Sequence, residues 1–173
     1  MRYLLDKVTV RYCLLGLIKV DKDQHLLNDE LLTLDLIFDS EAKQNQFFIS
    51  PNTANILTQF AQSHLYELAV HTFLQRVSVV SPARYFKRWS RRLREQGFTR
   101  EDAAILALAT FASWDSVFTS VNYVATFDQR MINNWLNQQT VIQARFQAMH
   151  TDLTAPYTIA KLPQVVHLDH IEV

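Results

Sequence analysis

Three aspartates are the residues of this chain whose type and placement could do chemistry together: Asp6, Asp102 and Asp128. Asp6 follows the apolar run RYLL, Asp128 follows VNYVATF, and Asp102 lies at the start of the helical stretch EDAAILALA. A carboxylate directly after a strand lies at the edge of an α/β sheet where ligands bind. Three anions meeting there would repel one another unless a cation such as Mg²⁺ or Mn²⁺ neutralised them. Such a cation activates water and stabilises a phosphoryl transition state, so phosphodiester hydrolysis is the expected chemistry.

Each aspartate also has an ordinary structural explanation. An aspartate after a strand is often a turn residue, and one in the first turn of a helix interacts favourably with the helix dipole. The combination is what favours function, because parallel strands end at the same edge of a sheet. Asp6 and Asp128 would then face each other if their strands are neighbours, and Asp102 could point into the same crevice.

The elements that must position these carboxylates alternate between strand and helix. Short apolar runs predict strands at residues 2–5, 47–50, 77–80 and 120–127, and a last edge strand within 162–173. Helical spacing and start signals predict helices at 7–19, from 28, 51–75, 82–97, from 99, and from 129. This alternation predicts a three-layer α/β/α sandwich with a parallel sheet of about four to five strands.

Two serine–proline pairs are typical helix starts. Ser50 and Ser81 would each be an N-cap followed by proline at the first helical position, and Gly97 is a suitable stop for the second helix. Thr99 would cap the next helix, with Asp102 three residues later in a variant of the capping box.

Composition limits the class of protein. The chain has 173 residues, 49% hydrophobic and 20% charged, which suits one globular domain over 1–173. Its net charge is zero, so any nucleic-acid site must be local. One cysteine excludes an intramolecular disulfide and a cysteine-based zinc site, and two glycines exclude a P-loop and a Rossmann fingerprint. The charged start of the chain matches neither a signal peptide nor a membrane span, so we expect a cytoplasmic protein with no membrane contact.

One stretch concentrates the basic residues. Residues 84–100 contain seven of the 17: Arg84, Lys87, Arg88, Arg91, Arg92, Arg94 and Arg100. Tyr85, Trp89 and Leu93 recur at helical spacing and would form the buried side of this helix. The remaining surface is either a solvated face with salt bridges, a surface that binds RNA phosphates, or a site for an acidic protein partner.

Four segments resemble, in chain order, the four conserved segments of PIN domains: YLLDKVTV, ISPNTANIL, FTREDAAILALA and YVATFDQRM. In that family they read LLDTNV, a serine-capped helix with a glutamate, a D-A-x-I helix start, and T-x-D. The resemblance covers about residues 2–135 and leaves 156–173 as a C-terminal extension with the edge strand. It implies a PIN-like fold, an Mg²⁺- or Mn²⁺-dependent ribonuclease, and Asp6, Asp102 and Asp128 as metal ligands and catalytic residues.

Two positions depart from the family pattern. Asn55 stands where the glutamate is expected, and Lys7 follows the first aspartate, where it could salt-bridge into the acidic cluster and take part of the cation's place. Among substitute acids, Glu101 would point about 100° away from Asp102 on a helix. Glu67 would lie three turns beyond Asn55, and Asp115 lies in the loop before the fourth strand.

Two classes of function therefore stay open. The first is a metal-dependent ribonuclease acting on RNA, which the resemblance extends to the toxin of a toxin–antitoxin pair with an antitoxin-like protein partner. The second is a catalytically inactive PIN-like module that binds RNA or protein. Dimers are common among similar proteins, so a homodimer is a further option, although nothing in the sequence specifies its interface.

Overall fold

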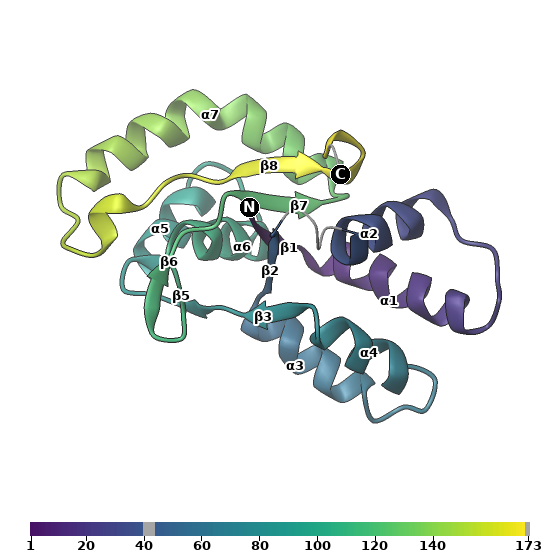
Figure 1. Ribbon diagram of the computed structural model, residues 1–173. Helices are drawn as coiled ribbons and strands as arrows, with labels where there is room; N and C mark the ends of the chain where they lie inside the picture. Colours follow the sequence, from purple (N-terminus) through teal and green to yellow (C-terminus); the bar gives the residue numbers. More distant parts are fainter. Residues whose placement is uncertain (40–43, 172–173) are drawn as a thin grey trace.

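The computed structural model describes residues 1–39 and 44–171. Its centre is a five-stranded sheet of order β3-β2-β1-β7-β8, in which every strand pairs in parallel with its neighbours (Figure 1). The strands are β1 (Arg2–Leu5), β2 (Gln46–Ile49), β3 (Val77–Val79), β7 (Tyr123–Thr126) and β8 (Gln164–His167). The predicted parallel sheet is confirmed, and β8 is the predicted edge strand.

Helices cover both faces of the sheet. One face packs against α1 (Lys7–Asp21), α2 (Asn28–Phe38), α3 (Pro51–Phe60) and α4 (Glu67–Leu74). The other packs against α5 (Phe86–Arg94), α6 (Arg100–Thr110) and α7 (Gln129–His150). Side chains of β1 alternate between the two cores, with Leu4 in one and Tyr3 and Leu5 in the other, as the two-residue period of a strand requires. The three-layer sandwich is thus confirmed.

The single helix predicted over 51–75 is wrong, because two helices occupy this stretch. The first ends at the C-cap Ala61, where Gln62 N–H and Ser63 N–H bond to carbonyls only three residues back. These tight turns redirect the chain. Phe60 then stacks on Tyr66 with ring centroids 5.2 Å apart, and Val70 and Phe73 of α4 become fully buried.

The helix start predicted at Ser81-Pro82 is also wrong. These two residues form a short strand, β4 (Ser81–Pro82), which pairs antiparallel with β5 (Ala112–Trp114). Strand β5 in turn pairs antiparallel with β6 (Val117–Thr119), and this hairpin was not among the predicted elements. Proline is tolerated in an edge strand because its missing N–H faces away from the ladder.

The remaining boundaries follow local signals. Helix α5 starts only at Phe86 and is followed by Gly97 at φ +85°, a conformation that glycine adopts without strain. The predicted strand over 120–127 is shortened to β7. Single turns of 3₁₀ helix, η2 (Tyr157–Ile159) and η3 (Leu168–His170), flank β8. Within the part of the chain that the structure describes, no helix is both long and apolar enough to cross a bilayer.

Candidate active site at the carboxyl edge of the sheet

Asp6 and Thr126 lie at the carboxyl ends of the neighbouring strands β1 and β7. Leu5 of β1 pairs with Ala125 of β7, so the residues after them emerge side by side. Thr126 Oγ1 donates a hydrogen bond to Asp6 Oδ2 at 3.1 Å. The other carboxylate oxygen, Oδ1, accepts the backbone N–H of Lys7 at 2.7 Å and caps α1. The end of β7 and the start of α1 thus hold the Asp6 carboxylate on both of its oxygens.

Asp128 is tied to the same threonine. Its backbone N–H donates to Thr126 Oγ1 at 2.9 Å, so Thr126 bridges the two aspartates. The Asp128 side chain is the N-cap of α7, with Oδ1 accepting from the N–H groups of Arg130 at 2.9 Å and Met131 at 3.1 Å. The second oxygen, Oδ2, has no hydrogen-bond partner among the described residues. Thr126 is a site residue that the sequence analysis did not single out, although the T-x-D pattern contains it.

Asp102 approaches from a different element. It lies in the first turn of α6, where its backbone N–H donates to the N-cap oxygen Thr99 Oγ1 at 3.1 Å. Its half-buried carboxylate makes no hydrogen bond or ion pair to any described residue. The predicted capping arrangement is confirmed, and it leaves this carboxylate available to a ligand.

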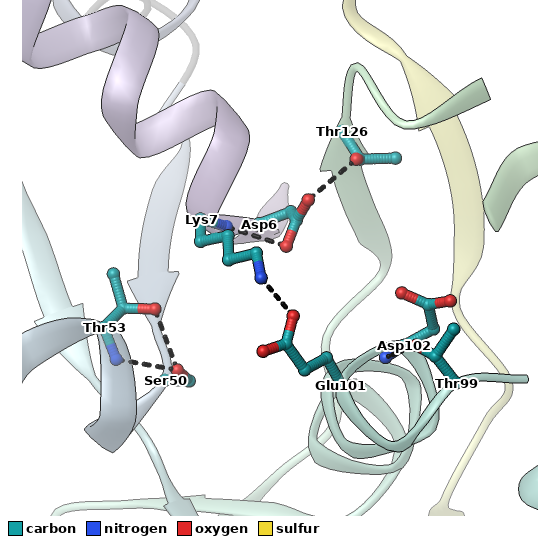
Figure 2. A network of polar contacts seen from close by, with 8 residues as sticks. All are labelled: Asp6, Lys7, Ser50, Thr53, Thr99, Glu101, Asp102 and Thr126. Carbon is teal, nitrogen blue, oxygen red and sulfur yellow. Dashed lines mark hydrogen bonds and ion pairs between the residues drawn. The ribbon is translucent and has the colours of Figure 1, made fainter. Parts of the chain in front are cut away.

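Lys7 and Glu101 connect α1 to α6. Their side chains form an ion pair although 94 residues separate them in sequence, and both are exposed (Figure 2). The hydrogen bond to Glu101 raises the pKa of Lys7 above its ordinary value, and the charges of Glu101, Asp6 and Asp102 add to this. The Lys7 ammonium therefore interacts with carboxylates from both α6 and the end of β1.

The carboxyl group of Asp6 is held in an unfavourable environment for an anion. Burial raises its pKa above the ordinary value, and the nearby charge of Asp128 acts in the same direction. The hydrogen bonds from Lys7 N–H and Thr126 and the positive charge of Lys7 offset this only in part. A further cation near Asp6 would therefore stabilise its ionised form.

Asn55, which the resemblance aligns with a glutamate, lies on α3. Ser50 caps this helix by accepting the N–H of Thr53 at 3.1 Å, and Asn55 lies further along it with an exposed side chain. Of the three possible substitute acids, Glu67 at the start of α4 pairs with His64, and Asp115 lies exposed in the β5–β6 turn. Glu101 alone contacts a residue adjacent to Asp6.

By donor chemistry the residues fit a hard divalent cation, because carboxylate and hydroxyl oxygens are the ligands that Mg²⁺ and Mn²⁺ prefer. They are not already gathered around one point: over residues 1–39 and 44–171, no three His, Cys, Asp or Glu side chains form a group that could hold a metal ion. We refer to Asp6, Asp102 and Asp128 together as the carboxylate site.

The basic residues from Arg84 to Arg100 divide into two groups. Tyr85, Trp89 and Leu93 are buried as predicted. Three arginines have partners: Arg84 bonds Thr154 Oγ1 at 3.2 Å, Arg88 pairs with Asp152 at 2.9 Å, and Arg92 pairs with Glu95 at 3.4 Å.

The others are exposed and have no ion pair within the described ranges: Lys87, Arg91 and Arg94, which we call the basic surface, and Arg100 at the start of α6. Helix α5 packs directly against α6, which carries Asp102.

Comparison with known proteins identifies the fold. No family model matches the chain, and no curated protein matches it by sequence. A chain from the crystal structure of VapBC2 from Rickettsia felis bound to a DNA fragment from their promoter is similar over 96% of this chain and 98% of that chain, with a TM-score of 0.50 and 15% identity. A chain of VapBC-1 from nontypeable Haemophilus influenzae aligns with 79% of this chain and 94% of its own, at 18% identity and a TM-score of 0.43. The five-stranded parallel sheet flanked by helices is a PIN-like fold.

Proposed function

We propose that this protein is a divalent-metal-dependent ribonuclease that hydrolyses phosphodiester bonds at the carboxylate site. One observation carries the proposal. Asp6 and Asp128 are joined through Thr126 at the carboxyl edge of a PIN-like sheet, and Asp102 enters from the start of α6 with its carboxylate unengaged. Such an arrangement is costly for a protein that does not use it, because burial and the charge of Asp128 both disfavour the ionised form of Asp6.

The residues have distinct roles in this proposal. Asp6, Asp102 and Asp128 would hold Mg²⁺ or Mn²⁺, and the bound ion would supply an activated water and stabilise negative charge on the phosphate. Thr126 is a positioning residue, since it fixes the Asp6 carboxylate and the backbone of Asp128. The basic surface on α5 would bind the RNA backbone, because unpaired arginine and lysine side chains neutralise phosphates.

A catalytically inactive module that binds RNA or protein is the second candidate. It is favoured by Lys7, whose ammonium already neutralises part of the acidic region, and by the exposed amide Asn55 at the expected glutamate position. Loss of one carboxylate weakens the hold on a cation, but three aspartates and water molecules can still supply its ligands. The three retained aspartates favour the enzyme.

The similar Rickettsia structure is of VapBC2, a toxin–antitoxin complex. We extend the proposal to a toxin role with an antitoxin-like protein partner. Induced expression of the native chain would then arrest growth, and a chain with Asp6→Asn and Asp128→Asn would not. Equal growth with both chains would contradict the toxin role and leave the ribonuclease proposal standing.

Calorimetric titration with Mn²⁺ tests the metal site. The native protein should bind Mn²⁺, and binding should disappear in Asp102→Asn, because this change removes the unengaged carboxylate. Asp21→Asn is the matched control, since it makes the same change at an exposed residue at the other end of α1. Absence of binding at millimolar Mn²⁺, together with absence of cleavage of single-stranded RNA, would contradict the proposal in favour of the inactive module.

A further inference from the structure

Lys7 places a positive charge where the proposed function requires a divalent cation. It is the first residue of α1, directly after Asp6, and its side chain reaches across to Glu101 at the start of α6 (Figure 2). Its ammonium interacts electrostatically with Asp6 and Asp102 as well as with Glu101. Two of the three carboxylates of the site therefore share this one internal cation.

Glu101 provides the anchor for this charge. The position where PIN domains carry a glutamate is Asn55 here, which leaves α3 without an acid at that point. Glu101 adds an acid from α6 instead, and its carboxylate faces Lys7 (Figure 2). The negative charge of Glu101 is already neutralised by the Lys7 ammonium.

We propose that Lys7 is a built-in counter-ion of the carboxylate site, held on Glu101, which a divalent cation must displace in order to bind. This inference rests on the proposed function. The ion pair is suited to such an exchange because both side chains are exposed, at 54% for Lys7 and 69% for Glu101, and exposed ion pairs contribute little to stability. The ammonium can therefore leave the site and remain solvated without unfolding the start of α1.

As a consequence, Lys7 lowers the affinity of the carboxylate site for a divalent cation. A unit positive charge about 6 Å from a divalent ion in a water-like dielectric weakens binding by roughly tenfold. The displaced Lys7 ammonium would remain tethered next to Asp6, so it would compete with the ion at every concentration. The site would therefore need a higher cation concentration for occupancy than the same site without the lysine.

Calorimetric Mn²⁺ titration of Lys7→Gln tests this directly. We expect roughly tenfold tighter binding than in the native protein, because the competing charge is removed. Lys22→Gln is the matched control: it removes the same charge at the C-cap of the same helix, about 22 Å from Lys7 along the axis, where salt screens it. The control should bind Mn²⁺ as the native protein does.

A second pair of variants identifies the anchor. Glu101→Gln should weaken Mn²⁺ binding, because it removes an anion and releases Lys7 toward Asp6 and Asp102. Lys7→Gln should then raise Mn²⁺ affinity by a larger factor in the Glu101→Gln background than in the native protein, because the released ammonium lies closer to the carboxylates there. If instead the effects of the two changes simply add, Glu101 is not the group that holds Lys7.

The outcomes separate the two proposals. Equal Mn²⁺ affinity in the native protein and Lys7→Gln would overturn the counter-ion role and leave the metal site intact. If Lys7→Gln binds Mn²⁺ and the native protein does not, the counter-ion role is supported and the ribonuclease proposal for the native chain is contradicted. Absence of binding in every variant up to millimolar Mn²⁺ would overturn both. Asp6→Asn added to Lys7→Gln should abolish the gained binding, which assigns it to this site.

Discussion

The carboxylate site and the basic surface of α5 are both charged, but they are assembled in different ways. The carboxylate site joins residues from three distant segments, and Asp6 and Asp128 are linked through Thr126. The basic surface comes from a single helix, and its exposed members act side by side. Charges linked through shared partners are strongly non-additive, whereas separated surface charges add. One substitution should therefore disable the first region, while the second should weaken step by step.

The largest expected effect is at Asp128, which is both a proposed ligand and a helix cap. Asp128→Asn and Asp128→Ala should each lower RNA cleavage by more than about a hundredfold, because the metal contributes several kcal/mol to the transition state. Only Asp128→Ala should also destabilise the fold, by about 1 kcal/mol, since asparagine still caps α7. Cleavage rates and urea unfolding separate the two roles. A fully active Asp128→Asn would remove this residue from the proposed chemistry.

The position of the basic surface depends on the apolar side of its helix rather than on its ion pairs. Leu93 is only 1% exposed, so Leu93→Ala should lower the free energy of unfolding by about 2–5 kcal/mol. Arg94→Ala, at the next residue, should change it by no more than about 0.5 kcal/mol. Urea unfolding of both variants measures the contrast, and similar losses would show that the charges also hold the helix in place.

Loss of the Thr126 hydroxyl should strongly lower Mn²⁺ affinity and activity, although the change is small. Thr126→Val removes the hydroxyl that links Asp6 to Asp128, and residues that orient metal ligands typically affect affinity or activity by about 10- to 100-fold. Thr126→Ser keeps the hydroxyl and should recover most of the activity. Mn²⁺ affinity and kcat/KM distinguish positioning from a loss of packing. If serine and valine behave alike, the hydroxyl has no positioning role.

The basic surface should respond in small, additive steps. Changing Lys87, Arg91 and Arg94 to glutamine should lower affinity for single-stranded RNA and reduce the slope of log affinity against log salt by about 2, since each phosphate contact contributes about 0.7. The matched control changes Arg88 and Arg92, whose charges are already paired with Asp152 and Glu95. An unchanged salt slope in the triple variant would identify the basic surface as a solvated face.

The smallest expected effect is on stability and depends on pH. The pKa of Asp6 is raised in the folded protein, chiefly by burial, so the folded state binds this proton more tightly than the unfolded chain does. Its contribution to stability is present at low pH and is lost as the pH rises from the ordinary pKa through the raised one. Asp6→Asn should therefore leave stability at pH 7 equal to or higher than that of the native protein. Urea unfolding between pH 3 and 7 checks this, and a loss of stability at pH 7 would contradict it.

Local signals predicted the strands of the parallel sheet and several helix caps, because a few neighbouring residues determine them. The apolar run RYLL, the cap at Thr99 and the stop at Gly97 all behave as their sequence indicates. The predictions failed where local signals compete with tertiary pairing. Ser81-Pro82 is a good helix start in isolation, yet these residues pair with β5, a partner about 30 residues away. The break after Phe60 likewise depends on packing that no local pattern reveals.

By itself, the sequence determined that Asp6 and Asp128 follow strands and that Asp102 begins a helix, since these placements follow from period and capping alone. Only the tertiary structure decided which groups meet there. Parallel pairing of β1 with β7 brings Thr126 onto Asp6, and the packing of the two helix layers brings Lys7 onto Glu101. Contacts between residues about 100 positions apart depend on strand order and helix direction, which the folding of the whole chain establishes.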